Sequence, residues 1–118
     1  MGHVYTQVTV SNPSDPDLTL SAEAMLDTGA TYTVVPRSVA NSLRLPITGK
    51  GRVRTATGEV QIERGRALVQ INGEAEINPV FISDTVDKIL IGVVTLEILA
   101  LTVDPTTGEL NEAELFFY

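Results

Sequence analysis

The sequence contains no cysteine and only one histidine, His3, among its 118 residues. Without cysteine the chain can form neither a disulfide nor a thiolate metal site. One histidine close to the start of the chain excludes a histidine-rich metal site, and any Ser-His-Asp or Cys-His mechanism would depend on a terminal residue. We therefore expect no metal and no cofactor.

Positive charge and aromatic side chains are also scarce. The chain has 8 Lys and Arg residues against 15 Asp and Glu residues, a net charge of −7, whereas a nucleic-acid-binding protein normally presents a basic face. Tryptophan is absent and aromatic residues make up 5% of the chain, so the core has to be aliphatic. We expect no nucleic-acid partner.

Hydrophobic runs are short. The most apolar stretch, residues 89–103, is interrupted by Glu97 and is shorter than the roughly 18 residues that a membrane-spanning helix needs. The first residues lack the basic start and the apolar core of a secretory leader. These features predict a cytoplasmic protein without a membrane partner, and the length predicts a single domain over residues 1–118.

Strand patterns dominate the first half of the chain. Alternating β-branched segments predict a hairpin of residues 3–10 and 18–26 around a long acidic loop, followed by a short strand at 31–36. Residues 37–45 space their apolar side chains in a way that suits one or two helical turns.

Turn residues and apolar runs organise the second half. Between residues 51 and 83, the turns Thr57-Gly58-Glu59 and Asn72-Gly73 predict two successive hairpins. After them we expect a buried strand at 88–91, a helix at 93–101 anchored by Leu96, Leu99 and Leu101, a turn at 102–110 and a last strand at 113–118.

An Asp-Thr-Gly triplet, Asp27 to Gly29, follows the apolar segment 18–26. Taken alone, the triplet could be an ordinary turn, because Asp and Gly are favoured in turns. Its apolar flanks disfavour that interpretation, since turns usually sit in a polar context. Segments 22–36 and 87–101 also echo each other, because each runs from an apolar strand into a glycine and a new element. The echo could be chance.

In order and motif the sequence resembles the retropepsin-like aspartic proteases, specifically their small single-domain prokaryotic members. The resemblance covers nearly the whole chain. It depends on an apolar pair before Asp-Thr-Gly-Ala, a Thr-Gly hairpin tip about 30 residues later and an Ile-Leu-Ile-Gly run before a helix. It implies a mostly β fold, a closed β-barrel that forms half of an acid protease, with a flap hairpin and one short C-terminal helix.

The resemblance further implies an aspartic endopeptidase that hydrolyses peptide or protein substrates. Such a reaction needs one group to deprotonate water and another to protonate the carbonyl oxygen, and two close carboxylates that share a proton supply both. Because the chain carries a single Asp-Thr-Gly, Asp27 would have to meet its copy across the twofold axis of a homodimer.

Roles follow by resemblance at the matching positions. Asp27 is the expected catalytic carboxylate, Thr28 locks the two active-site loops together and Gly29 brings its amide to the carboxylate. Gly92 has a structural role beneath this loop. The residues expected to contact substrate are Ala30 and Thr31 after the triplet and Ala56, Thr57 and Gly58 at the flap tip. Thr57-Gly58 could equally be an ordinary hairpin tip.

Three features leave questions open. Thr31 and Tyr32 stand where retroviral members often have acidic residues that bind the substrate backbone, and Ala100 stands near a glycine that ends the helix in many relatives. The apolar end of the chain, which could form the dimer sheet or pair within its own monomer, consists of Phe116, Phe117 and Tyr118. An alternative function is a catalytically silent retropepsin-like domain for binding or dimerisation, because a fold does not guarantee a function.

Overall fold

The computed structural model describes residues 4–104 and 106–113. His3 and residues 114–118, which include most of the predicted last strand, lie outside the described residues. One sheet contains β1 (Val4–Asn12), β2 (Asp15–Leu26), β3 (Thr33–Pro36), β4 (Ile47–Thr55), β5 (Gly58–Ile71), β6 (Glu74–Ser83) and β7 (Ile89–Ile91). The other described elements are α1 (Arg37–Ser42), α2 (Val93–Ile98), β8 (Leu101–Val103) and β9 (Leu110–Glu112). The prediction of a mostly β fold is confirmed.

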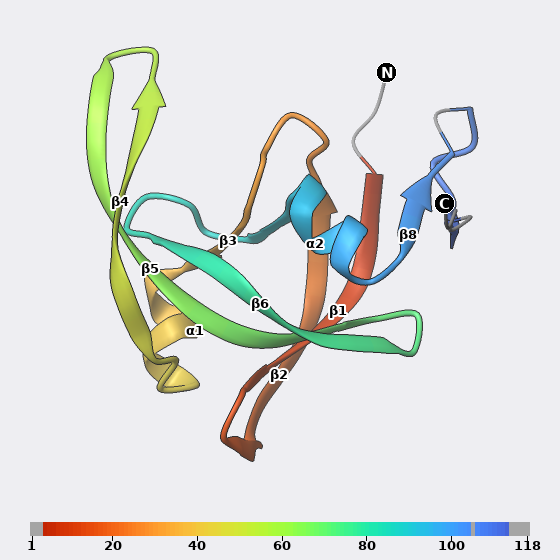
Figure 1. Ribbon diagram of the computed structural model, residues 1–118, viewed down its shortest axis with the longest axis horizontal. Coiled ribbons are helices and arrows are strands. Elements are labelled where there is room, and N and C mark those ends of the chain that lie inside the picture. Colours follow the sequence, from red (N-terminus) through yellow and green to blue (C-terminus); the bar gives the residue numbers. More distant parts are fainter. Residues whose placement is uncertain (1–3, 105, 114–118) are drawn as a thin grey trace, which may run out of the picture.

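The large sheet has the strand order β1-β2-β7-β3-β6-β5-β4, and β1 pairs additionally with β5. This extra pairing joins Thr9 to Gln70 and Ser11 to Leu68, so the sheet curves round on itself (Figure 1). The two predicted hairpins of residues 51–83 are confirmed as β4–β5 and β5–β6, but the first turn is Ala56-Thr57, because Gly58 and Glu59 already pair with Thr55 and Arg54. Asn72 and Gly73 both have positive φ angles, 53° and 82°, as a tight two-residue hairpin turn requires.

The first hairpin differs from its prediction. Its strands continue into residues 11–17, so the expected long acidic loop is wrong and only Pro13 and Ser14 separate β1 from β2. The pairing jumps from Ser11 with Thr19 to Asn12 with Asp15, leaving the intervening residues of β2 as an irregularity in the ladder. A proline without a backbone N–H fits such a position, which explains why Pro16 does not end the strand.

The helices are shorter than predicted. α1 ends at Ser42 and α2 at Ile98, where residues 45 and 101 were expected. Leu101 is therefore not a helix anchor but the first residue of β8, and residues 102–110, predicted as a turn, form most of the β8–β9 hairpin. The helix ends before β8 because Ala100 has a φ of 55°, which is incompatible with a continuing helix. Within the described residues no helix is long and apolar enough to cross a membrane.

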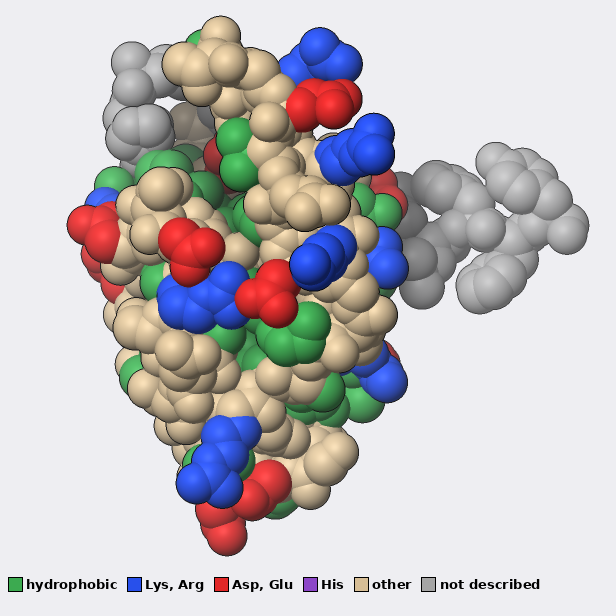
Figure 2. All heavy atoms as spheres, turned by 90° about the vertical axis from the view of Figure 1, so that its left-hand side faces the viewer, with side chains coloured by type: hydrophobic (Ala, Val, Ile, Leu, Met, Phe, Trp, Pro, Cys, Tyr) green, Lys and Arg blue, Asp and Glu red, His purple; other side chains and the backbone are tan. Residues whose placement is uncertain are grey.

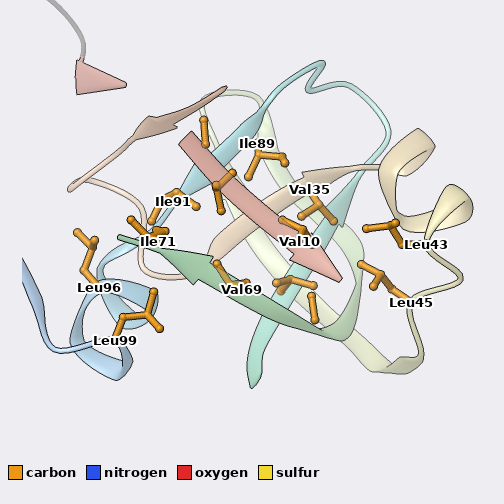
Figure 3. Close-up of a cluster of buried hydrophobic side chains, with 14 of the residues drawn as sticks. Val10, Val35, Leu43, Leu45, Val69, Ile71, Ile89, Ile91, Leu96 and Leu99 are labelled. Carbon is orange, nitrogen blue, oxygen red and sulfur yellow. The ribbon is translucent and has the colours of Figure 1, made fainter. Parts of the chain in front are cut away.

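The core is aliphatic, as the composition predicts. Inward-facing residues of β1, β5 and β7 meet in its centre, where Val10, Val69 and Ile91 are fully buried. Figure 3 shows Leu96 of α2 and Leu99 just after it reaching the end of this core that holds Ile71, while Leu43 and Leu45 after α1 close the opposite end. Burying a leucine side chain stabilises a fold by about 2 kcal/mol, so both short helices are held mainly by this packing.

Candidate active site

The Asp27 loop begins where β2 ends. Leu26 pairs in parallel with Ile91 of β7, and the Asp27 amide continues this ladder by donating to the Ile91 carbonyl at 2.9 Å. The Gly29 amide donates to the Asp27 carboxylate, with 3.0 Å between N and Oδ1. The turn that follows Asp27 therefore holds its carboxylate in place. Asp27 is half-buried, whereas Thr28 and Gly29 beside it are exposed.

Gly92 lies directly beneath this loop. A Cβ atom at Gly92 would stand 2.5 Å from the Tyr32 carbonyl carbon and 2.8 Å from the Thr31 oxygen, both backbone atoms. This contact lets α2 begin against the loop, where the amides of Val93 and Val94 donate to the carbonyls of Ala30 and Thr31 at 2.9 Å each. The loop thus satisfies donors that a helix start otherwise leaves unpaired.

The repeated pattern of the sequence has a spatial counterpart. β2 and β7, the strands that precede Asp27 and Gly92, are parallel neighbours in the sheet. The two units are joined by hydrogen bonds in both directions. The Asp27 amide donates to the Ile91 carbonyl, and the amides of Val93 and Val94 donate to the carbonyls of the segment that follows Asp27. The echo between residues 22–36 and 87–101 therefore corresponds to two paired structural units.

Two buried threonines, which the sequence patterns do not single out, complete this junction. Thr33 and Thr95 are 0% and 1% exposed, and their hydroxyl oxygens lie 2.6 Å apart. The Thr33 hydroxyl oxygen also accepts from the Gly92 amide at 3.1 Å. One detectable signal was Thr33 itself, a polar residue at the same alternation position as the buried Val35 of β3.

A groove of about 830 Å³ lies next to the loop. Four of the residues predicted to act in the site line it, namely Gly29, Ala30, Thr31 and Thr57. Asp27, Thr28, Ala56 and Gly58 are not among its lining residues. The groove thus extends from the segment that follows Asp27 to the β4–β5 hairpin, with β6 and the turn after it as a further wall.

The β4–β5 hairpin projects from the body of the molecule (Figure 1). Its turn is formed by Ala56 and Thr57, and the Thr55 hydroxyl donates to the Gly58 carbonyl at 2.8 Å across it. Gly58 has a φ of 128°, a conformation that residues with a Cβ rarely adopt. Gly58 is therefore required by the turn itself.

Charge on the hairpin side of the molecule is mixed. Figure 2 shows basic and acidic side chains interspersed there rather than separated by sign. Arg37, at the start of α1, contacts Glu63 of β5 and donates from Nε to Asp84 Oδ1 at 2.9 Å. The hydrogen bond from Arg37 holds the pKa of the Asp84 carboxyl below its ordinary value, and Asp84 in turn raises the pKa of Arg37.

The fold is similar to that of a solved protease structure. The EIAV protease, solved in complex with the inhibitor HBY-793, matches 98% of this chain over 94% of its own length, with a TM-score of 0.67 and 18% sequence identity. At this identity the match defines the fold, which is that of a retroviral protease.

Sequence comparison specifies the family. The model of the family described as "gag-polyprotein putative aspartyl protease" matches residues 19–98, more than half of the chain. The chain therefore belongs to this family of retroviral-type aspartyl proteases. A comparison with curated proteins finds no match.

Proposed function

We propose that the protein is an aspartic endopeptidase that acts as a homodimer, with one Asp27 from each copy in a shared active site. The observation that carries the proposal is the position of the Asp27 carboxylate. It is held by the Gly29 amide at 3.0 Å, on a loop whose next residues line a groove of about 830 Å³. Family membership supports the same chemistry.

A dimer is needed because each chain supplies one Asp-Thr-Gly. The exposure of Thr28 and Gly29 leaves this side of the loop open to a second copy, and a twofold axis beside it would bring two Asp27 carboxyl groups together. Thr28 would then hold the two loops to each other through its hydroxyl. The monomer, with a single carboxylate, would be inert.

The proposed reaction uses the two carboxyl groups as one unit. Two carboxyl groups a few ångströms apart share a proton, because both cannot ionise cheaply. The ionised member accepts a proton from water as the water attacks the scissile carbonyl carbon, and the protonated member donates to the carbonyl oxygen. As the tetrahedral intermediate collapses, the carboxyl that took the proton from water donates it to the leaving nitrogen, and the other carboxyl regains its proton from a hydroxyl of the intermediate. The C–N bond breaks and releases the amine and the acid. Activity should be greatest below neutral pH, where one carboxyl of the pair keeps its proton.

The substrate would lie extended between the Asp27 loop and the β4–β5 hairpin. Ala30 and Thr31 on one side and Ala56, Thr57 and Gly58 on the other are the proposed contacts, and the hairpin would close over the peptide as a flap and exclude water. The backbone of an extended peptide can form hydrogen bonds with segments on both sides of a groove, while pockets bind its alternate side chains.

The test is cleavage of an undirected peptide mixture across mildly acidic to neutral pH, with new termini read by mass spectrometry. We expect cleavage that disappears in Asp27→Asn and persists in the control Asp87→Asn, an exposed acidic residue that is not among the lining residues of the groove. Below the concentration at which the protein dimerises, the rate should rise faster than linearly with enzyme concentration.

One result of this experiment would contradict the proposal. If the wild type and Asp27→Asn give the same peptide profile at concentrations where the protein is shown to be dimeric, the peptidase proposal is wrong. The alternative, a retropepsin-like domain that binds or dimerises without turnover, would then take its place.

A further inference from the structure

Two aromatic rings meet in the wall of the groove. Tyr32, from the segment before β3, and Phe81 of β6 both line the groove, and their ring centroids are 5.2 Å apart at an interplanar angle of 68°. This edge-to-face arrangement is a favourable one for aromatic rings. Tyr32 remains 37% exposed, so a ring in this corner is available to a ligand.

The flap hairpin places a glycine on the Phe81 ring. A Cβ atom at Gly51 of β4 would lie 3.1 Å from Cε1 and 3.3 Å from Cζ of Phe81. Any larger residue at this position would have to displace the ring. Gly51 therefore sets how closely the hairpin and the aromatic pair approach each other.

The face of the hairpin around Gly51 is apolar. Gly51 is paired with Ile62, and Val53 with Val60, so these four residues lie on one face of the two strands. Val53, Val60 and Ile62 line the groove, and Val60 is 50% exposed. Two of the charged residues that also line the groove are already paired, Arg54 with Glu59 and Asp84 with Arg37.

We propose that Tyr32 and Phe81, with Gly51 packed against the Phe81 ring, form a specificity-determining subsite that selects a large, preferably aromatic, side chain of the substrate. The inference rests on the proposed peptidase function and names the residues that set its preference. An aromatic side chain in this corner would meet the edge-to-face pair on one side and the apolar hairpin face on the other. The subsite would bury more apolar area of such a side chain than of a small one.

The experiment compares two peptides that differ at one position. The position is the one at which the wild-type cleavage profile shows its strongest aromatic preference, and the pair carries Phe or Ala there. We expect the ratio of kcat/KM for the two peptides to exceed about tenfold in the wild type, the discrimination that a fitted apolar pocket gives. Gly51→Ala should reduce this ratio several-fold, because its Cβ forces the Phe81 ring to shift by a few tenths of an ångström.

A matched glycine serves as the control. Gly49 lies two residues earlier on the same strand, and neither glycine is a lining residue of the groove. A Cβ atom at Gly49 would meet only the end of the flexible Arg64 side chain, at 2.9 Å, and not the Phe81 ring. Gly49→Ala should leave the ratio unchanged. Tyr32→Ala, at a partly exposed position, should reduce the ratio as well and gives a second test if Gly51→Ala does not fold.

The outcomes separate the two proposals. Cleavage that depends on Asp27, with the same peptide ratio in the wild type, Tyr32→Ala and any folded Gly51→Ala, would overturn the subsite and leave the peptidase standing. A wild type that shows no aromatic preference at any position would do the same. The absence of any cleavage that depends on Asp27 would overturn both.

Discussion

At the scale of single residues, Gly92 has the least freedom in the site. α2 can contact the Asp27 loop only because Gly92 has no Cβ. A Cβ atom there would collide with backbone atoms of Thr31 and Tyr32, which cannot rotate away as a side chain could. We expect Gly92→Ala to cost about 3 kcal/mol of unfolding free energy, at the upper end of overpacking effects. Urea unfolding measures this cost.

Gly49→Ala is the control for Gly92→Ala, because the side chain that it would meet is flexible. Its unfolding free energy should stay within about 0.5 kcal/mol of the wild type. Equal stability of Gly92→Ala and Gly49→Ala would show that the Asp27 loop and α2 can separate without cost.

Ala100 shows the opposite situation, a residue with a Cβ where glycine fits better. It holds a φ of 55°, a conformation that costs an L-residue about 1–2 kcal/mol. We therefore expect Ala100→Gly to stabilise the protein by about 1 kcal/mol, measured by thermal or urea unfolding. Ala75→Gly, at an exposed position near the start of β6, should instead destabilise it by about 0.5 kcal/mol. A loss of stability in both variants would contradict the assigned strain.

At the scale of elements, one ion-pair cluster connects α1 with β5 and with the turn after β6. Arg37 at the start of α1 joins Glu63 in β5 and Asp84 just after β6. Because Asp84 has a lowered pKa in the folded protein, its ionised form stabilises the fold. This contribution is fully present above the ordinary value of 3.8 and is lost as the pH falls through the lower, folded value.

Asp84→Asn tests this linkage. The variant should be less stable than the wild type at neutral pH, and the difference should shrink as the pH falls below about 4. Urea unfolding over a pH series measures both. Asp87→Asn changes another exposed acidic residue of the same turn. Its difference in unfolding free energy from the wild type should show no comparable decrease toward low pH. A difference for Asp84→Asn that grew toward low pH would have the wrong sign for an ionised partner of Arg37.

At the scale of the whole molecule, the proposed dimer predicts inhibition by an inactive copy. When the wild type is mixed with an equal amount of Asp27→Asn and subunits exchange at random, half of the wild-type chains pair with an inactive partner. Activity should therefore fall to about half of that of the same amount of wild type alone. Addition of Asp87→Asn in place of Asp27→Asn should raise the activity. If the enzyme works as a monomer, the addition of Asp27→Asn should leave the activity unchanged.

The sequence determined the class of this protein and most of its local structure. Asn72-Gly73 specified a hairpin because few residues accept two successive positive φ angles, and the apolar segments before Asp27 and Gly92 specified buried strands because they have to leave water. The order of these motifs was enough to identify the aspartic protease fold that the structural match shows.

Only the tertiary structure decided which residues hold the candidate site together. The Thr33–Thr95 pair and the placement of Phe81 against Gly51 both join segments that are far apart in the chain. No local propensity or periodicity encodes such contacts, because each depends on the distance between strands that pair through the whole sheet. The left-handed Ala100 is a further example, since packing imposed on it a conformation that its own sequence preference opposes.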